Sequence, residues 1–444
     1  PNLDLIIKEG SYFSNSITCA PSTLPSVGSI FTSKYPFEST IRNNENFIFN
    51  SQIPNYVNEL KINGYTTYAF IPKILDHYGF SNLFDETKTF EHNRSLYDDG
   101  ENILCQLSNN VKEPWFFYLH LFDLHGYKKF DENEKLKQFH NIQYGKNKYE
   151  QMVSALDVWL GKIIDKINLE NTLIIFTADH ATDDANYTEK LQKYKKNIRT
   201  YNPNLIVKSS IKFGKKTPKF LSPIRTKLKN KFLEKRTATL SKKKNDELEA
   251  IQHMDLSPYE GRLMMNAVRT TYHIYDDRLQ IRLLFLGYNV PKNKIVENQV
   301  QSVDIFPTIF EIIGLSFSTE IRGRSLFSLL CNKEMDDVPA FLESATNHKD
   351  IMNVNVIGLR TPEFKYFRDR HDSNSNVHLF NLYNDPHEEQ NIASKNESLI
   401  NKMEKSLSEL NKNGNFSFQE NITTLRDNEQ TEQITAELKK LGYI

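Results

Sequence analysis

Hydrophobic and polar positions change period repeatedly along the first part of the chain, which predicts helices and strands in turn. Residues 53–63 have helical spacing and end at Gly64, a residue type that commonly stops helices, and the aromatic and β-branched run 65–71 follows as a strand. The opening stretch 1–13 (PNLDLIIKEGSYF) also has a helical pattern. The chain therefore begins as an alternation of the two kinds of element.

Two apolar runs predict strands that are buried on both faces. Residues 115–122 (WFFYLHLF) and 172–177 (TLIIFT) are short and almost continuously hydrophobic, and residues 149–167 between them have the spacing of an amphipathic helix. Strands that alternate with helices predict an α/β fold in which a mostly parallel sheet is flanked by helices on both faces. In such sheets the reactive groups gather just beyond the carboxyl ends of the strands.

The domain organisation that we predict has one large and one small part. A catalytic α/β domain covers residues 1–330 and contains an insertion at about 186–270. A smaller α+β subdomain covers residues 331–444, with a β-hairpin or edge strands within 356–382 and helical segments from residue 398 onwards.

The insertion is strongly basic. Within 208–244 we count fourteen Lys or Arg residues and one acidic residue, Glu234. Such a segment has no apolar core of its own. We interpret it either as a solvated insertion or as a basic lid that attracts an anionic substrate.

Composition narrows the classes of function. Lys plus Arg (56) equals Asp plus Glu (56), so the net charge is zero and a surface built as a whole for nucleic acid or an anionic membrane is disfavoured. No apolar run reaches about 18 residues, so we predict no membrane span, and the chain shows no signal peptide. The three cysteines fit neither a disulfide framework nor a thiolate zinc site.

Thr23 begins the first stretch with candidate chemistry, residues 23–36 (TLPSVGSIFTSKYP). It follows a turn signal and stands where a helix begins, near Leu24 or Pro25. Backbone N–H groups and the helix dipole favour negative charge at such a position. The Thr23 hydroxyl can therefore attack a phosphoryl or sulfuryl centre, or it can be an ordinary helix cap.

Asp179 and His180 come directly after the second buried strand. A carboxylate oxygen and an imidazole nitrogen side by side can form half of the shell of a divalent cation. The alternative is a helix cap next to a surface histidine. Two adjacent ligands do not complete a metal site, so the sequence pattern leaves both interpretations open.

A third polar cluster, His120, Asp123 and His125, lies on or after the first buried strand. His120 shares a strand face with Phe122, so we interpret it as a core histidine. His125 lies beyond the strand end, where a histidine can protonate a leaving oxygen or bind an oxyanion because its pKa is near neutrality.

Together and in this order, the motifs resemble those of the sulfatase family of the alkaline-phosphatase superfamily. Residues 23–36 are similar to the family's nucleophile block, and residues 1–18 are similar to the helix that follows its first strand. LHLFDLHGY and TLIIFTADHA are similar to the blocks that end aspartate-proline-histidine and aspartate-histidine-glycine. The C-terminal series also matches in order: YDDRLQIRLLFLG, SVDIFPTIFEIIGL, RGRSLFSLL, GLRTPEFKYFRD, LFNLYNDPHEEQNIA and LKKLGYI. The resemblance implies an alkaline-phosphatase-like fold over nearly the whole chain.

The resemblance implies a nucleophile at Thr23. Cys19 offers a competing register, because CAPS also fits the family's cysteine-x-proline-serine and cysteine is the precursor of the formylglycine of true sulfatases. In the family the nucleophile precedes the block's final threonine by nine residues, and counting back from Thr32 leads to Thr23 rather than Cys19. We therefore favour Thr23.

The resemblance also implies the other site residues. Asp179 and His180 match the family's downstream metal ligands, and Thr23 would meet the same cation, which we expect to be Ca, Mg, Mn or Zn. His125 matches the histidine near the leaving oxygen. His273 falls near a position where relatives place a lysine or histidine, although its register is off by one or two residues.

Two departures from the family pattern bear on these expectations. The family's first strand, with its metal-binding aspartates, would precede Pro1, so we expect either a fragment of a longer chain or a protein inactive for want of ligands. Val27 stands where the family has the arginine of proline-serine-arginine. The loss of that cation weakens an assignment to sulfate esters.

We predict a metal-dependent hydrolase of sulfate or phosphate esters. Phosphate is slightly favoured, because a threonine sulfate ester lacks the elimination route that is open to formylglycine hydrate. The alternatives are a transferase that moves a phospho-alcohol head group onto a glycan, and a non-catalytic member that binds an anionic glycan. The expected partner is an anionic ester, with a glycan or a lipid head group as candidates. Compartment and oligomeric state stay open, although relatives are often periplasmic or secreted.

Overall fold

A computed structural model gives the structure of most of the chain, in two units. It describes residues 1–42, 47–91, 94–126, 131, 133–182, 188–198, 246, 248–267, 274–344 and 356–411. The larger unit comprises 1–185 with 272–444, and the smaller comprises 186–271. Each unit is described by itself.

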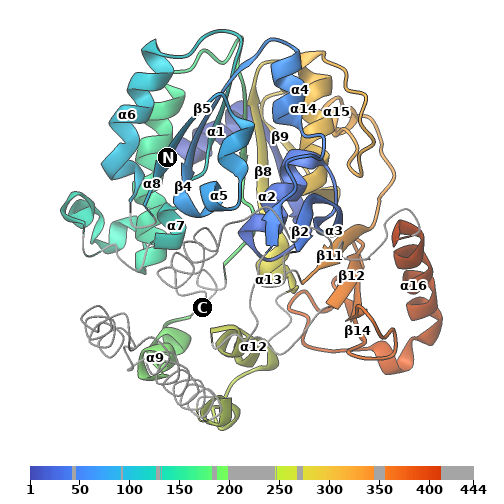
Figure 1. Ribbon diagram of the computed structural model, residues 1–444. Coiled ribbons are helices and arrows are strands. Elements are labelled where there is room, and N and C mark those ends of the chain that lie inside the picture. The colour runs from blue at the N-terminus through green and yellow to red at the C-terminus, as the bar shows by residue number, and fades with distance from the viewer. Residues whose placement is uncertain are drawn as a thin grey trace, which may run out of the picture. The chain divides into compact units, whose positions relative to one another are not determined.

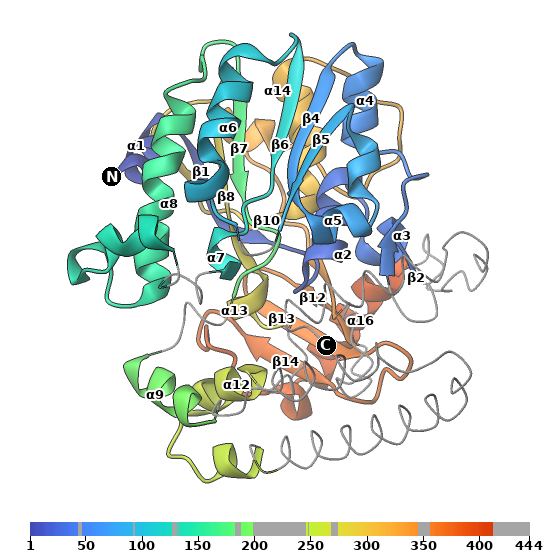
Figure 2. The same cartoon turned by 60° about the vertical axis from the view of Figure 1, so that its left-hand side comes forward.

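The first group of strands in the larger unit is built around β1 (Gly10–Ile17). On one side β1 pairs antiparallel with β8 (Gln280–Gly287), which in turn pairs antiparallel with β7 (Leu173–Thr177). On its other side β1 pairs parallel with β9 (Lys294–Val296) and β10 (Val300–Gln301). Figure 2 shows β1, β7, β8 and β10 of this group.

The second group of strands is fully parallel. β4 (Thr66–Pro72) lies between β5 (Glu86–Phe90) and β6 (Trp115–Leu119). The predicted strands at 65–71, 115–122 and 172–177 are thus β4, β6 and β7. The described strands pair in a mixed but mainly parallel pattern, and only β8 in these two groups runs against its neighbours.

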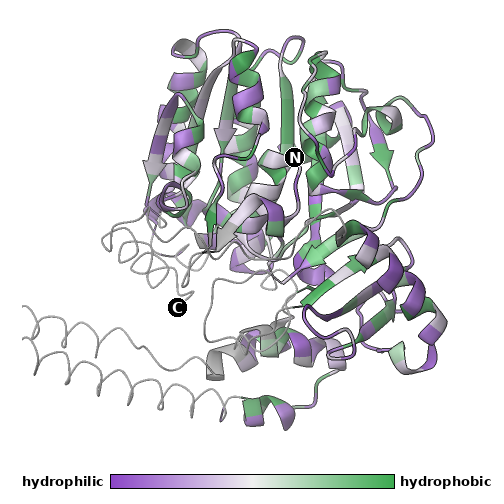
Figure 3. Ribbon diagram, turned by 45° about the vertical axis from the view of Figure 1, so that its right-hand side comes forward, coloured by the Kyte–Doolittle hydropathy of each residue, from purple (hydrophilic) through white to green (hydrophobic). Residues whose placement is uncertain are grey.

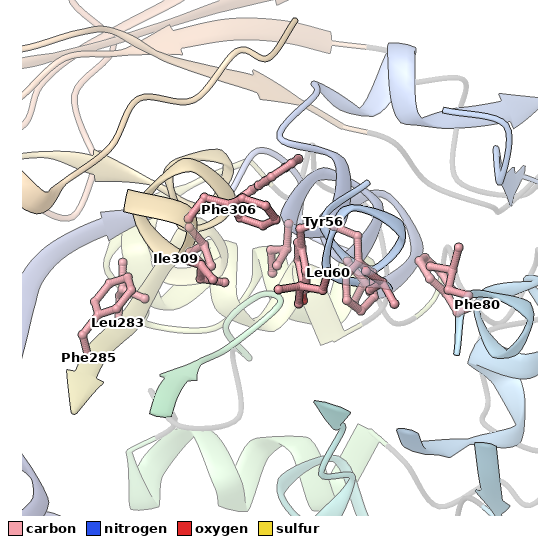
Figure 4. Packing of buried hydrophobic residues seen from close by; sticks show 14 of the residues in the cluster. Tyr56, Leu60, Phe80, Leu283, Phe285, Phe306 and Ile309 are labelled. Carbon is pink, nitrogen blue, oxygen red and sulfur yellow. The ribbon is translucent and has the colours of Figure 1, made fainter. Parts of the chain in front are cut away.

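Helices cover both faces of these strands. α2 (Thr23–Thr32), α4 (Tyr56–Ile62) and α14 (Ile305–Ile313) contribute buried residues to one apolar cluster. Figure 4 shows Tyr56, Leu60, Phe306 and Ile309 of that cluster. α1 (Asn2–Glu9), α6 (Leu96–Asn109) and α8 (Lys148–Ile164) contribute to a second cluster. The sheet is therefore enclosed by two layers of helices, as Figure 1 shows, and hydrophobic residues concentrate in its strands (Figure 3).

Shorter elements complete the unit. The short helices and strands are α3 (Pro36–Ser39), β2 (Thr40–Arg42), β3 (Phe47–Phe49), α5 (Lys73–His77), α7 (Asp123–Gly126), α13 (Asp276–Leu279) and α15 (Phe327–Leu330). The 3-10 turns are η1 (Phe80–Leu83), η3 (Glu134–Phe139), η4 (Ile142–Tyr144), η7 (Ser302–Asp304) and η8 (Ala393–Lys395). No helix among the described residues combines the length and apolar character needed to cross a bilayer.

The expectation of a single helix at the start of the chain is wrong beyond Glu9. The helix stops there, and residues 10–17 form the strand β1. At Gly10 the chain comes so close to β8 that a Cβ atom would lie 2.4 Å from the carbonyl oxygen of Phe285. Pairing with β8 therefore overrides the helical pattern of the sequence from this residue onwards.

The C-terminal part of the larger unit is a four-stranded antiparallel sheet with a helix beside it. Its strands pair in chain order: β11 (Ala340–Glu343), β12 (Val356–Arg360), β13 (Phe364–Asp369) and β14 (His378–Asn381). α16 (Glu397–Asn411) places Met403 and Leu407 in one cluster with residues of β12 and β13. This is the α+β part that the sequence predicts, and residues 412–444 lie outside the described part.

A buried cluster of charges joins this sheet to α13. The Lys365 ammonium, fully buried, pairs with Asp276 and lies 2.8 Å from Glu388, and Arg360 donates to Asp276 at 2.8 Å. Burial alone would raise the pKa of Asp276, but Lys365 and Arg360 outweigh burial and hold that pKa below its usual range. Burial also raises the pKa of Glu388, to about 7.

The smaller unit is described in part. α9 (Glu189–Ile198), helical residues 248–252 and α12 (Pro258–Ala267) share a small core of Leu191, Ile251, Leu263 and Met264. Lys190 ties them together by donating to the carbonyl oxygen of Asp255 at 2.8 Å. The basic segment 208–244 lies outside the described residues.

Removal of Lys365 should destabilise the larger unit. Lys365→Ala leaves two buried carboxylates with fewer positive partners, so we expect the free energy of unfolding to fall by about 3 kcal/mol. Urea unfolding followed by fluorescence measures it. Lys402→Ala, at an exposed position of α16, is the matched control and should change the value by less than about 0.5 kcal/mol. Equal effects of the two substitutions would contradict this prediction.

Candidate functional site

Thr23 stands at the half-buried start of a helix whose later residues are all buried. α2 begins at Thr23, and all of its later residues, Leu24 to Thr32, are buried. Ser26 fixes this end, because its hydroxyl donates to the carbonyl oxygen of Ala20 at 2.7 Å. Figures 1 and 2 show α2 at the same edge of the strands as α5 and α7, which follow β4 and β6.

Thr23 meets the residues that follow β7. Thr23 Oγ1 lies 3.4 Å from His180 Nε2. The Thr23 hydroxyl is also among the groups that lower the pKa of Asp179. Asp179 Oδ1 accepts from the backbone N–H of His180 at 2.9 Å, and Asp179 Oδ2 lies 3.6 Å from His180 Nε2. The structure therefore brings Thr23 together with two adjacent residues that follow it by about 157 positions in the chain.

The tautomer of His180 follows from its other nitrogen. His180 Nδ1 lies 2.9 Å from the carbonyl oxygen of Ala181, which can only accept, so Nδ1 carries the proton. In the neutral ring Nε2 is then an acceptor, and it faces Thr23. The backbone N–H of Ala181 donates to the carbonyl oxygen of Arg278 at 3.0 Å, which attaches this loop to α13. Such a histidine can accept the Thr23 proton or bind a metal.

Asp179 is ionised at neutral pH. Burial by itself raises its pKa, but His180, His120 and the hydrogen bond from Thr23 outweigh burial, so the pKa of Asp179 lies below its ordinary value. A carboxylate, an imidazole nitrogen and a hydroxyl oxygen are donors that suit a divalent cation. In the part of the chain that the structure describes, however, no group of three or more His, Cys, Asp or Glu side chains could hold a metal ion. The described residues thus supply only part of a metal shell.

Cys19 lies in a different environment from Thr23. It is 1% exposed, and its Sγ is 3.9 Å from Ser302 Oγ. Burial raises the pKa of the Cys19 thiol to about 12, so the thiol stays neutral. Cys19 packs in a cluster with Tyr35 and Phe341.

Asp123 and His125, from the third polar cluster of the sequence, lie in different environments. Asp123 is buried and accepts from the backbone N–H of Leu96 at 3.0 Å, which holds the first turn of α6. His125 lies in α7, exposed, with its ring 4.4 Å from that of Phe122. Its role stays a prediction, and His273 lies outside the described residues.

His120 was interpreted from the sequence as a satisfied core histidine, and the structure gives its ring a hydrogen-bonding partner in the strand that it directly follows. The ring is half-buried, and its Nδ1 lies 2.9 Å from the Tyr118 hydroxyl. Burial lowers the pKa of His120, and Asp179 and His180 act on it electrostatically. The sequence signal for this hydrogen bond is the spacing of two residues between Tyr118 and His120, which places both side chains on the same face of an extended chain.

Two family models match the chain. Residues 1–230 match the model described as Sulfatase, and residues 271–413 match the model described as N-sulphoglucosamine sulphohydrolase, C-terminal. Arylsulfatase K of Mus musculus is 30% identical over 127 residues, which are 27% of this chain and 23% of that protein. The chain therefore matches about a quarter of the length of this curated relative.

Solved structures with the same fold cover most of the chain. Phosphonate monoester hydrolase of Agrobacterium radiobacter has a TM-score of 0.62 at 14% identity, covering 92% of this chain and 90% of that one. Ps i-CgsB in complex with k-i-k-neocarrahexaose has a TM-score of 0.60 at 16% identity, covering 100% and 92%. At these identities the likeness shows the fold, and the predicted α/β class with helices on both faces is confirmed.

Asp123 should make stability depend on pH. Burial raises its pKa from 3.8 to about 6 in the folded protein. Because the folded pKa exceeds the unfolded one, the stabilising contribution of the neutral carboxyl is complete below about pH 3.8 and is lost as the pH rises through about 6. The difference corresponds to about 3 kcal/mol. Asp123→Asn should therefore remove the fall in unfolding free energy between pH 4 and pH 7.

Urea unfolding at several pH values between 4 and 7.5 measures this effect. Asp165→Asn, which changes an exposed aspartate at the end of α8, is the control and should leave the pH profile as it is. An unchanged profile in Asp123→Asn would assign the pH dependence to other groups.

Proposed function

The chain belongs to the sulfatase family of the alkaline-phosphatase superfamily, and from this membership we propose that it hydrolyses sulfate or phosphate esters with Thr23 as its nucleophile. The observation that carries the proposal is the meeting of Thr23 with His180 and Asp179. A hydroxyl beside an imidazole nitrogen and a carboxylate that can together hold a cation is placed so that the cation can activate it as a nucleophile.

The chemistry assigned to the chain's own residues is a transfer to Thr23 Oγ1. The proton of the hydroxyl passes to solvent water as Oγ1 bonds to the phosphorus or sulfur atom and the bond to the ester oxygen breaks, because Nε2 of His180 is assigned to the cation. Backbone N–H groups at the start of α2 favour the negative charge that develops there. His125 gives a proton to the leaving oxygen, and water then hydrolyses the ester on Thr23.

A threonine nucleophile is better suited to phosphate esters than to sulfate esters. A phospho-threonine can be resolved by water, whereas a sulfated threonine cannot collapse to an aldehyde and needs a second attack at sulfur. The fully buried Cys19, with its neutral thiol, is a poor alternative nucleophile. The likeness in fold to a phosphonate monoester hydrolase is compatible with a phosphorus centre.

Sulfatases are in general metal-dependent, and we propose Asp179 and His180 as two ligands of a divalent cation near Thr23. When bound, such an ion supplies charge stabilisation for the transferred group. Ca, Mg, Mn and Zn are the candidates, and the histidine favours Mn or Zn. An anionic ester on a glycan or a lipid head group is the proposed substrate class.

Turnover of para-nitrophenyl esters tests the reaction. Release from a phosphate monoester or diester in the presence of one of the four metals, and its loss with chelator, is the expected result. Release from the sulfate alone would favour sulfate esters. Release that requires an added acceptor alcohol would indicate the transferase instead. No release under any of these conditions would leave glycan binding as the function to pursue.

Thr23→Ala should lower kcat at least about 1,000-fold, because the attacking oxygen is lost. Thr23→Ser keeps a hydroxyl in the same place and should retain measurable turnover. Cys19→Ala should leave kcat within about twofold. The reverse pattern, with full activity in Thr23→Ala and loss in Cys19→Ala, would move the nucleophile to Cys19. Circular dichroism and the melting temperature check that each variant folds.

Removal of the Asp179 carboxylate should weaken metal binding. A bound ion stabilises the folded protein by mass action, so Mn²⁺ or Zn²⁺ should raise the melting temperature of the unaltered chain. Asp179→Asn should abolish most of that rise, and Asp165→Asn should retain it. The ligand assignment fails if the two variants respond alike.

A further inference from the structure

The short helix α13 is bonded to both chain segments that lead to the proposed site. The carbonyl oxygen of Arg278 accepts from the backbone N–H of Ala181 at 3.0 Å, in the loop that follows β7. The carbonyl oxygen of the next residue, Leu279, accepts from the backbone N–H of Thr18 at 2.9 Å, where the chain leaves β1 toward α2. The last carbonyl groups of a helix lack partners within it. In α13, two of them join the two segments that meet in the site.

The other end of α13 is held by Glu388, which follows β14. Glu388 Oε2 accepts from the backbone N–H of Asp276 at 2.7 Å, and Glu388 Oε1 lies 2.8 Å from the Lys365 ammonium in β13. The first N–H groups of a helix also lack partners within it, and a carboxylate is a strong acceptor for them. Glu388 therefore attaches the start of α13 to the C-terminal sheet, and Figures 1 and 2 show α13 between that sheet and the larger group of strands.

Glu388 has an uncommon backbone conformation for a deeply buried residue. Its φ is 53°, in the left-handed region that glycine adopts most readily, and the residue is 3% exposed. A residue with a side chain keeps such a conformation where its surroundings compensate for the strain. Those surroundings include the contacts of the carboxylate with Asp276 and Lys365. The backbone conformation and the attachment of α13 therefore depend on the same side chain.

We propose that Glu388 is a positioning residue of the site: it holds α13 in place, and α13 in turn holds the loop after β7 next to the segment that leads to Thr23. A helix of four residues has little stability of its own, so its place depends on such external bonds. The pairs of the Asp276 side chain with Arg360 and Lys365 remain when Glu388 is replaced, so α13 is loosened rather than lost. The effect on turnover rests on the proposed function, whereas the attachment of the two segments through α13 does not.

Two substitutions of Glu388 separate positioning from stability. Glu388→Ala and Glu388→Gly both remove the carboxylate, but glycine adopts the positive φ without strain, so Glu388→Gly should have the higher melting temperature of the two. If the role of Glu388 is positioning, the two variants lose activity equally. If the role is only structural, the loss follows the melting temperature. Glu388→Gln keeps an oxygen that can accept from the N–H of Asp276, and it should therefore retain most of the activity.

Glu404 offers a matched control in the same sheet. Its carboxylate pairs with Arg368 of β13 at 2.7 Å and accepts from the Tyr366 hydroxyl at 2.8 Å. Glu404 thus bonds to the same strand as Glu388 does, but its described contacts are with β13 rather than with α13. Glu404→Ala removes a carboxylate from the C-terminal sheet and leaves the bonds of α13 in place.

Amide hydrogen exchange of the full chain tests the attachment without turnover. In Glu388→Ala and Glu388→Gly the amides of Ala181 and Thr18 should exchange at least about 10-fold faster than in the unaltered chain, relative to the amide of Ala69 in the core strand β4. The comparison with Ala69 corrects for changes in overall stability. Glu404→Ala should leave both relative rates within about twofold. Unchanged relative rates at Ala181 and Thr18 in both Glu388 variants would overturn the proposal.

Kinetics test the effect on the reaction. Glu388→Ala and Glu388→Gly should each lower kcat about 10-fold and leave KM within about twofold, since the loss concerns the alignment of the reacting groups rather than substrate binding. Glu404→Ala should leave both constants within about twofold. If the unaltered chain turns over esters and Glu388→Gly has the kcat of Glu404→Ala, the positioning role is overturned. If the unaltered chain shows no turnover but the exchange rates change as expected, the hydrolase proposal fails and the attachment through Glu388 stands.

Discussion

Burial of helix α2 along its length is the constraint on which the site depends. Leu24 to Thr32 are all buried, and only Thr23 at the start of the helix remains partly exposed. Because a densely packed helix cannot shift without opening cavities, the core fixes the position of the Thr23 hydroxyl. The polar groups that meet it come from the end of β7, a strand that packs against the same cluster. The packing of the apolar core therefore also fixes the relative positions of the site residues.

A second constraint acts from the C-terminal sheet. The loop behind His180 is held by the hydrogen bond between Ala181 and the carbonyl oxygen of Arg278 in α13. Asp276, in the same short helix, pairs with Arg360 and Lys365 of the C-terminal sheet. A four-residue helix has little stability of its own, so these buried pairs keep α13 in place. The smaller sheet thereby supports the loop that carries Asp179 and His180.

The sequence predicted the strands at β4, β6 and β7 and the strand-end positions of Asp179 and His180, because buried strands and helix stops have strong local patterns. It did not predict β1, since the pairing of residues 10–17 with β8 joins segments about 270 residues apart and leaves no local signal. The same limit applies to the site. Motif spacing singled out Thr23, but its 3.4 Å approach to His180 joins segments 157 residues apart, and no local pattern sets such a distance.

Val27 shows how the core restricts the chemistry of the site. It stands where the family has an arginine, and in this chain it is 1% exposed within the apolar cluster around α2. An arginine at this depth would carry a charge into the core, which is unfavourable without a buried partner. Under the proposed function, the negative charge of a transferred group would therefore be met by other groups, namely the N–H groups at the start of α2 and a cation held with the help of Asp179. Because Val27 cannot supply the positive charge of an arginine, the proposed reaction depends more strongly on the Asp179 carboxylate. We therefore consider the groups around Asp179 decisive for the reaction.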